Sequence, residues 1–247
     1  MPGDRQRNVI VVDNEGTLPR TLEKGNWTTH LVRPNANLGY LNGAHFGINA
    51  LEKRAGCCPD WWIVCNPDVR IDPLFFRQLL GTSWPESTAQ LAPDIREAGA
   101  WPRNPFRSDR PAPQHIRRRR QLFSSILSLA PYVAAARAKR LCACPPAAPP
   151  RRMPIYAAHG SLMVMHRRFF EAGGTLSFDG FLYGEEIHIA EQIQRMGMQT
   201  IWAPSLRVRH RGGTALRHIS LEQRRQWWYE SYDVLYRNYF RSEETSW

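Results

Sequence analysis

The sequence has no long hydrophobic run and few cysteines. None of its apolar stretches reaches the roughly 18 residues of a membrane-spanning helix. The first eight residues are polar and charged, without the apolar region of a secretory signal. The 5 cysteines are an odd number and contain no Cys-x-x-Cys pair, so neither a disulfide framework nor a zinc site is expected. These absences predict a cytoplasmic protein.

The composition predicts a globular chain whose basic charge is confined to one segment. Of 247 residues, 43% are hydrophobic and 22% charged, and the net charge is +11. Residues 103–152 hold twelve Lys and Arg against one acid, Asp109, and the rest of the chain is balanced at 21 against 21. A nucleic-acid-binding protein, which the basic balance would suggest, therefore ranks as the third hypothesis, because no recognised nucleic-acid motif is present.

Short β-branched runs and helical patterns alternate along the chain. Strands are expected where apolar runs stop at turn residues, and helices where apolar residues recur every three or four positions. This alternation predicts an α/β fold with a mainly parallel sheet and flanking helices. The expected strands are residues 9–12, 29–32, 61–65, 161–165, 200–202 and 207–210, and the expected helices are residues 43–54, 167–172, 185–196 and 221–240. An aromatic stripe at spacing four in the last helix is expected to be packing: Trp228, Tyr232, Tyr236 and Phe240.

Residues 101–152 form a basic, proline-rich segment that we expect to be a helical insertion. A helix is expected over residues 115–130, with four arginines at 117–120 near its start. Pro131 is expected to interrupt or end it. Such a helix is typical of a surface for anionic lipid or an acidic partner, but also of an insertion with a solvated end. Residues 142–150 are expected to be a linker. The chain is thus expected to be one domain (1–247) with parts at 8–100, 101–152 and 153–247.

Several polar residues fall where strands are expected to end. In such sheets ligands bind at the carboxyl ends of strands. Asp13 and Asp68 lie there, and Asp68 could hold a divalent cation or only begin a turn. His210 could coordinate a metal and Arg211 could face phosphate, although a single histidine is more often structural. The carboxylates of Glu185 and Glu186 could raise each other's pKa for base catalysis, or only complement a helix dipole. Asn37 and Gly39 are equally ambiguous by themselves.

Taken in order, these residues resemble a known family. A strand ending in Val12-Asp13-Asn14 precedes Asn37-Leu38-Gly39, and a further strand ends in Asn66-Pro67-Asp68. Later come Gly160-Ser161, Gly173-Gly174, Phe178-Asp179, Tyr183-Gly184-Glu185-Glu186 and His210. Together they resemble the family 2 glycosyltransferases, and more narrowly the rhamnosyltransferase-like branch. The resemblance covers about half of the chain.

The resemblance implies a GT-A fold and inverting transfer of a sugar, possibly rhamnose, from a nucleotide diphosphate donor in bacterial cell-envelope synthesis. Glu186 would be the base, supported by Glu185. Asp68 and His210 would hold Mg²⁺ or Mn²⁺ on the diphosphate. The acceptor would be a polysaccharide or a lipid-linked glycan, with residues 115–130 touching the cytoplasmic membrane face and no nucleic acid bound. The expected donor contacts are Asp13, Asn37, Gly39, Asn66, Asp68 and Arg211.

Two departures from the family pattern bear on activity. The family has one more strand and helix before its Val-Asp-Asn strand, and Met1 lies only nine residues before Ile10. That strand is therefore expected to be missing here. In addition, Glu186 replaces the family's aspartate, and misplacing a catalytic group by about 1 Å can cost about a hundredfold in rate. The second hypothesis is therefore a truncated or inactive homologue that binds only nucleotide or a partner.

Overall fold

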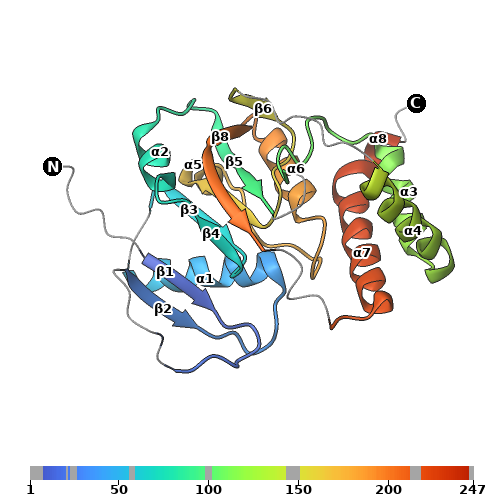
Figure 1. Ribbon diagram of the computed structural model, residues 1–247, viewed down its shortest axis with the longest axis horizontal. Helices are drawn as coiled ribbons and strands as arrows, with labels where there is room; N and C mark the ends of the chain where they lie inside the picture. Colours follow the sequence, from blue (N-terminus) through green and yellow to red (C-terminus); the bar gives the residue numbers. More distant parts are fainter. Residues whose placement is uncertain are drawn as a thin grey trace.

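The computed structural model describes residues 8–20, 22, 27–55, 59–97, 102–142, 151–211 and 218–244. They form an α/β fold in which two sheets lie beside a group of helices (Figure 1). Within these ranges, no helix is long and apolar enough to cross a membrane. The expected linker at 142–150 and the glycines after Arg211 lie almost wholly outside the described residues.

The small sheet consists of β1 (Asn8–Val12) and β2 (Thr28–Val32), which pair in parallel. It packs on α1 (Tyr40–Ala55). In the described part of the chain β1 pairs only with β2.

The large sheet has the order β3-β7-β5-β8-β4, and β6 also pairs with β8. Its strands are β3 (Trp61–Cys65), β4 (Val69–Ile71), β5 (Thr88–Arg96), β6 (Met153–Ile155), β7 (Leu162–His166) and β8 (Gln199–His210).

The α/β prediction is confirmed, but the sheet is mixed instead of mainly parallel. Among the described strands, only β1 with β2 and β5 with β8 run parallel. The strand β7 enters antiparallel between β3 and β5, and the short strands β4 and β6 run antiparallel to β8. Strand direction depends on how the long connections cross, and the composition of a strand does not record it.

Alternate residues of β7 divide the hydrophobic core between the two faces of the large sheet. Leu162 and Val164 pack with α2 (Phe75–Gly81), whereas Met163 and Met165 face the cluster formed with α1, α6 (Glu185–Arg195) and α7 (Leu221–Leu235). The short helix α5 (Arg167–Glu171) follows β7 directly. The predicted elements in this half of the chain are thus confirmed, with 200–202 and 207–210 joined in one strand.

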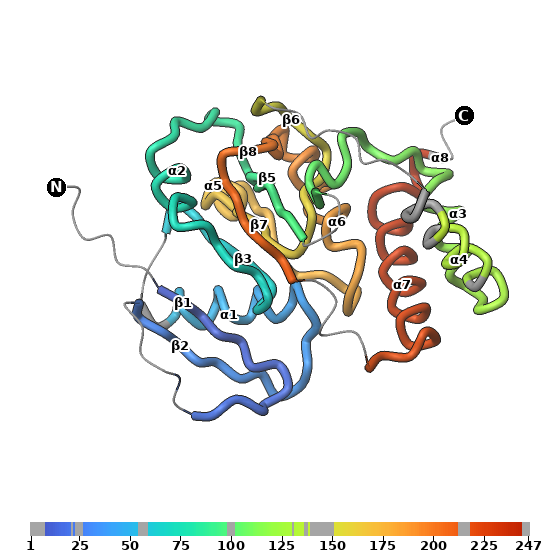
Figure 2. The backbone as a smooth tube through the Cα atoms, viewed as in Figure 1, coloured from blue at the N-terminus to red at the C-terminus, as the bar shows by residue number. Residues whose placement is uncertain are grey.

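The inserted segment forms a helical hairpin against the last helices. Its arms are α3 (Pro113–Phe123) and α4 (Ile126–Cys142), and they lie beside α7 in Figure 2. The helix α7 continues through a π turn, η1 (Tyr236–Phe240), into α8 (Arg241–Glu244). The predicted aromatic stripe is confirmed as packing, because all four rings join the core.

The prediction of one helix over residues 115–130 is wrong, because α3 ends at Phe123 and α4 begins at Ile126. The hydroxyl of Ser124 donates to the carbonyl of Gln121 at 2.7 Å, and that of Ser128 to the carbonyl of Leu122 at 2.6 Å. These side chains satisfy the carbonyls at the end of α3 in place of a continued helix. Pro131, expected to interrupt the helix, lies inside α4.

The strand β5, which contains a proline, was not predicted. Its residues are buried along nearly their whole length between β7 and β8, a position in which proline would remove a ladder hydrogen bond. The structure accommodates Pro93 with a register shift between Pro93 and Asp94. Asn104 then donates its Nδ2 to the carbonyl of Pro93 at 2.9 Å and accepts from the amide of His159 at 2.7 Å.

We expect Asn104→Ala to lower the free energy of unfolding by about 1–3 kcal/mol, because it leaves the buried carbonyl of Pro93 and the part-buried amide of His159 without their partner. Urea denaturation measures this change. Gln121→Ala, at an exposed position on α3, is the control and should change the free energy by less than about 0.5 kcal/mol. Equal values for the two variants would contradict the role given to Asn104.

Candidate functional site

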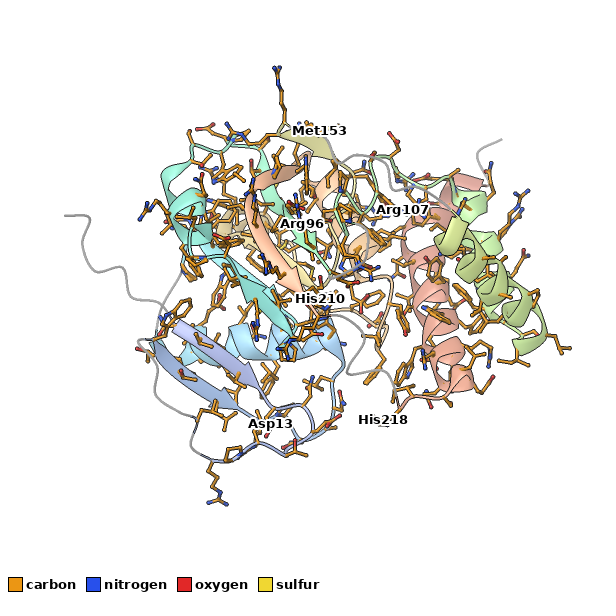
Figure 3. The ribbon with its side chains drawn as sticks, viewed as in Figure 1. Asp13, Arg96, Arg107, Met153, His210 and His218 are labelled. Carbon is orange, nitrogen blue, oxygen red and sulfur yellow. The ribbon has the colours of Figure 1, made fainter. Side chains whose placement is uncertain are left out.

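Three strand ends bring Asp68, Glu97 and His210 together. The register of β4 with β8 places Val69 opposite His210, so the preceding Asp68 lies beside the histidine. The parallel register of β5 with β8 places Arg96 opposite Arg209, which brings Glu97 there too. Figure 3 shows His210 near the centre of the molecule, where β8 ends, and Asp13 on the loop after β1.

The imidazole of His210 is held between the two carboxylates. Its Nδ1 lies 2.8 Å from Oε1 of Glu97, and its Nε2 lies 3.1 Å from Oδ1 of Asp68. Burial alone would raise the pKa of Glu97, but hydrogen bonds and charge from Arg103 and His210 lower it below its ordinary value. Glu97 is therefore a carboxylate that can accept a hydrogen bond from Nδ1–H of His210. In that tautomer the lone pair of the imidazole is on Nε2.

The residues around His210 fit a divalent cation. Nε2 is buried and has no hydrogen-bond partner among the described residues, although it lies close to Asp68. A carboxylate oxygen suits Mn²⁺ or Mg²⁺, and an imidazole nitrogen converging on the same point is a ligand that a transition metal such as Mn²⁺ accepts more readily than Mg²⁺. Metal-binding histidines commonly donate their other N–H to a carboxylate, which is the position of Glu97. No group of three or more such ligands occurs in the described ranges, so further ligands would come from a diphosphate or water.

The second part of the site is a buried pair of carboxylates at the start of α6. Glu186 accepts the amide of Gly160 at 3.1 Å through Oε1. Glu185 accepts the amide of Tyr183 at 2.7 Å. Tyr183 and Gly184 both have left-handed backbone, with φ of 74° and 80°. This turn aims both acids inward and leaves a residue other than glycine, Tyr183, in a strained conformation.

Burial raises the pKa of both acids above the ordinary glutamate value, and for Glu185 the charge of Glu186 adds to the effect. A carboxylate with a raised pKa is a better base near neutral pH. The hydroxyl of Tyr40, which opens α1, donates to the carbonyl of Gly160 at 2.6 Å. Gly160 is thus fixed on both its N–H and its carbonyl.

The histidine and carboxylate clusters are joined through the segment before β7. The amide of Asn66 donates to the carbonyl of Ser161 at 3.0 Å, and Gly160 binds Glu186. Asp68 follows Asn66 by two residues. The arrangement therefore places the candidate cation ligands Asp68 and His210 at strand ends, and the buried Glu186 of α6 against the segment that enters the neighbouring strand β7.

The loop expected to contact a donor lies against residues 181–184, the turn before Glu185 and Glu186, which we call the acid turn. Asn37 accepts the amide of Gly39 at 3.0 Å, and Asn14 donates to the carbonyl of Gly39 at 2.9 Å. Gly39 has a φ of 76°, and a Cβ there would lie 2.1 Å from the carbonyl oxygen of Phe181. Only glycine permits this approach. Asn37 and Gly39 are thus brought to the turn that carries Glu185 and Glu186.

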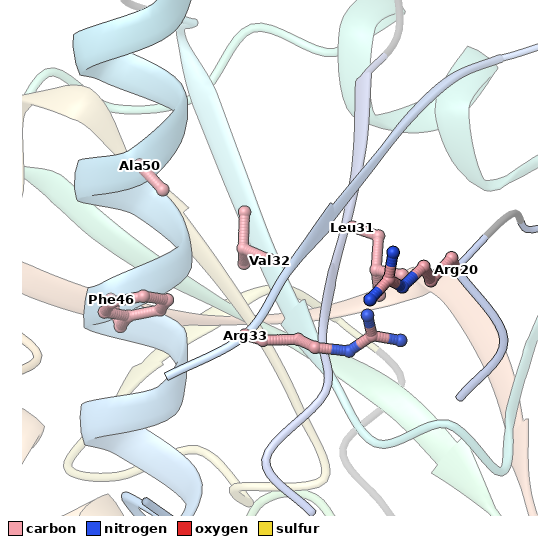
Figure 4. A pocket seen from close by; sticks show the side chains of 6 residues that line it. All are labelled: Arg20, Leu31, Val32, Arg33, Phe46 and Ala50. Carbon is pink, nitrogen blue, oxygen red and sulfur yellow. The ribbon is translucent and has the colours of Figure 1, made fainter. Parts of the chain in front are cut away.

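Asp13 organises its own loop. Its carboxylate accepts the amides of Thr17 and Leu18, each at 3.1 Å, and Nε of Arg33 at 2.8 Å. Arg33 also lines a cavity of about 430 Å³ with Phe46 and Arg20 (Figure 4). None of the predicted site residues lines that cavity.

Arg211 is exposed, and its amide donates to the carbonyl of Asp68 at 3.2 Å.

Several residues of the site were missed in the sequence. Glu97 and Arg103 lie at an unpredicted strand end and in the basic segment, so no local pattern marked them. Tyr40 and Asn42 begin α1, and Asn42 holds both backbone groups of Phe178, at 2.7 and 2.9 Å. A cluster of asparagines around a predicted helix start was the available signal.

Comparisons with known proteins show what the chain as a whole resembles. No family model matches the chain. In two strains of Mycobacterium tuberculosis, an N-acetylglucosaminyl-diphospho-decaprenol L-rhamnosyltransferase is 27% identical over 217 residues, covering 84% of this chain and 67% of the relative. In sequence, the chain resembles rhamnosyltransferases. A crystal structure of GalNAc-T7 with UDP, GalNAc and Mn²⁺ matches with a TM-score of 0.47 and 16% identity, over 76% of this chain and 33% of that one. The chain thus spans a third of the length of that solved structure.

We expect Glu185→Gln to weaken the dependence of stability on pH. A carboxyl with a raised pKa in the folded state stabilises the fold below the pKa of the unfolded chain, and this contribution is lost as pH rises through the folded-state value. Free energies of unfolding from urea denaturation between pH 5 and pH 9 should fall less in the variant than in the natural chain. Glu52→Gln, at an exposed position on α1, is the control. An identical fall in all three proteins would contradict the prediction.

Proposed function

We propose that the chain is an inverting glycosyltransferase that moves a sugar from a nucleotide diphosphate donor to a glycan or lipid-linked acceptor. Rhamnose is the sugar that we propose. The observation that carries this proposal is that buried Glu186, at the start of α6, is bound to Gly160 before β7, beside the strand ends where His210 and Asp68 converge. The likeness to a rhamnosyltransferase named for a diphospho-decaprenol acceptor supports the same reaction. The proposal treats residues 1–247 as one catalytic unit.

Glu186 takes the proton of the acceptor hydroxyl in this reaction. The hydroxyl oxygen attacks the anomeric carbon of the donor sugar, the bond from that carbon to the diphosphate breaks, and the nucleoside diphosphate leaves with the bonding electrons. Attack from the opposite face inverts the anomeric configuration. The raised pKa of Glu186 suits it to accept this proton, and the amide of Gly160 fixes its orientation.

Asp68 and His210 would hold Mg²⁺ or Mn²⁺ on the donor diphosphate, with Glu97 orienting the imidazole. The bound cation would neutralise the negative charge on the leaving diphosphate. Asn37, Gly39 and Asn66 would contact the donor from the neighbouring loops, and Arg211 would lie beside its phosphates. Asp13 would act on the donor's base or ribose through the loop that it organises.

Two variants and a ligand panel test this function. Nucleotide diphosphates and nucleotide sugars, with and without Mn²⁺, should raise the melting temperature for one nucleotide class, since a ligand at 100 times its Kd adds about 2.7 kcal/mol. Asp68→Ala should lose the Mn²⁺-dependent shift. Glu186→Gln should keep that shift but lose transfer to a lipid-linked N-acetylglucosamine acceptor by about a hundredfold or more.

Full transfer activity in Glu186→Gln would overturn the assignment of the base. A cooperative melt with no shift for any nucleotide would favour the inactive homologue.

We also propose that the chain works at the cytoplasmic face of a membrane and that the tip of the α3–α4 hairpin touches it. The apolar face of α3 is not available for this contact, since Ile116 and Phe123 are buried in the core. Arg119 and Arg120 contact Tyr232 and Asp233 of α7.

At the hairpin tip, however, Leu127 is 83% exposed and Ile126 39%. Arg225 donates Nη1 to the carbonyl of Phe123 at 2.7 Å, and this bond brings the start of α7, with Leu221 40% exposed, to the same end of the helices. Two exposed arginines, Arg117 and Arg118, lie on α3 before the tip. An apolar tip below a basic helix suits an anionic bilayer.

Leu127→Asp should weaken co-sedimentation with anionic vesicles about tenfold or more, because one buried leucine contributes about 1.5–3 kcal/mol. Leu74→Asp, at an exposed leucine before α2, is the matched control and should bind as the natural chain does. Unchanged vesicle binding by Leu127→Asp would remove the tip as the contact, whatever the outcome of the transfer assay.

A further inference from the structure

The turn that carries the acid pair rests on α7. The ring of Tyr183 lies 4.8 Å from that of Trp228, and the ring of Phe181 lies 4.8 Å from that of Trp227. The hydroxyl of Ser231 donates to the carbonyl of Leu182 at 2.9 Å. These contacts fix the backbone on the N-terminal side of Glu185.

The inserted hairpin packs against α7, and one of its aromatic side chains reaches Trp228. Phe123, the last residue of α3, is buried and stacks on Trp228 with centroids 5.4 Å apart and an interplanar angle of 24°. It also meets Tyr232 edge-on at 5.2 Å. The indole of Trp228 therefore contacts Phe123 of the insertion as well as Tyr183 of the acid turn.

We propose that Phe123 is a positioning residue for catalysis: through Trp228 it holds Tyr183 in place, so that the inserted hairpin sets the geometry of Glu185 and Glu186. The proposal rests on the function proposed above, in which Glu186 is the base. It assigns the basic insertion a role inside the active site, in addition to any contact at its tip.

The strained backbone of Tyr183 makes the support necessary. A residue other than glycine with a φ of 74° persists only where its surroundings determine that conformation. Tyr183 donates its amide to Glu185, so a relaxed turn would lose this bond and admit water to both acids. Without Phe123 the indole of Trp228 would lose a stacked neighbour and gain the freedom to turn away from Tyr183.

Water entering the turn would change how the acids titrate. The other titratable groups that face them are Tyr40 of α1, Arg107 of residues 102–112, Tyr232 of α7 and Tyr183 of the turn itself. Replacing Phe123 removes none of these groups, although Tyr232 loses its edge contact with the ring. Because burial raises the pKa of Glu185 and Glu186, hydration would lower it, and the acid limb of the rate profile would move to lower pH.

Phe123→Ala and Leu129→Ala form the matched pair for the test. Leu129 is a fully buried residue of α4 in the same hydrophobic cluster, outside the contacts between Phe123, Trp228 and Tyr183. Hydrogen exchange of residues 180–186 should rise about tenfold or more in Phe123→Ala and stay within about twofold of the natural chain in Leu129→Ala. In the transfer assay, kcat should fall about tenfold or more only in Phe123→Ala, with the donor KM little changed and the acid limb shifted to lower pH.

Equal exchange in the two variants would overturn the proposal, as would a fall in kcat of the same size in both. If Phe123→Ala does not fold, Trp228→Leu, at a half-buried position, replaces it with the same expectations. Hydrogen exchange needs no activity. A natural chain without transfer activity would therefore overturn the proposed function, while the exchange data would still decide whether the insertion holds the turn.

Discussion

The burial of two adjacent carboxylates is the constraint on which the site depends. Placing Glu185 and Glu186 out of water is costly unless hydrogen bonds compensate each one. The turn before α6 supplies one amide, from Tyr183, and the segment before β7 supplies the other, from Gly160. Each donor is held in turn, Gly160 by Tyr40 and Tyr183 by Trp228. Elements from the start, middle and end of the chain therefore all meet at this pair.

The histidine cluster follows a different physical rule, since its geometry comes from backbone register. Asp68 precedes β4, Glu97 follows β5 and His210 ends β8, and the hydrogen-bond ladders of β8 with β4 and with β5 fix their separation. A ladder is stiff, so ligands at strand ends need little further support. The acids lie on a turn and need many side-chain contacts. The proposed site therefore combines a rigidly placed pair of candidate cation ligands with a proposed base whose position depends on packing.

The insertion illustrates how composition can mislead about location. Its net charge suggested a solvated or membrane-bound helix. In the structure, Arg110 of this segment binds Glu191 of α6 through two hydrogen bonds of 2.7 and 2.9 Å, and Tyr156 donates to the same carboxylate at 2.6 Å. Arginine forms such two-pronged pairs because its guanidinium is planar. Part of the basic surplus thus serves to attach the hairpin to the fold.

The sequence alone determined the α/β class, most strand and helix positions, and the residues at the strand ends. Hydrophobic period and turn residues are local, so they can be read without the fold. Strand direction, the buried strand β5 with its Pro93 and the partners Glu97, Arg103 and Tyr40 were decided by the tertiary structure. Each depends on groups far apart in the chain, such as the hydroxyl of Tyr40 and the carbonyl of Gly160. Long-range hydrogen bonds and ring contacts leave no local pattern, and they determine which of the candidate residues meet.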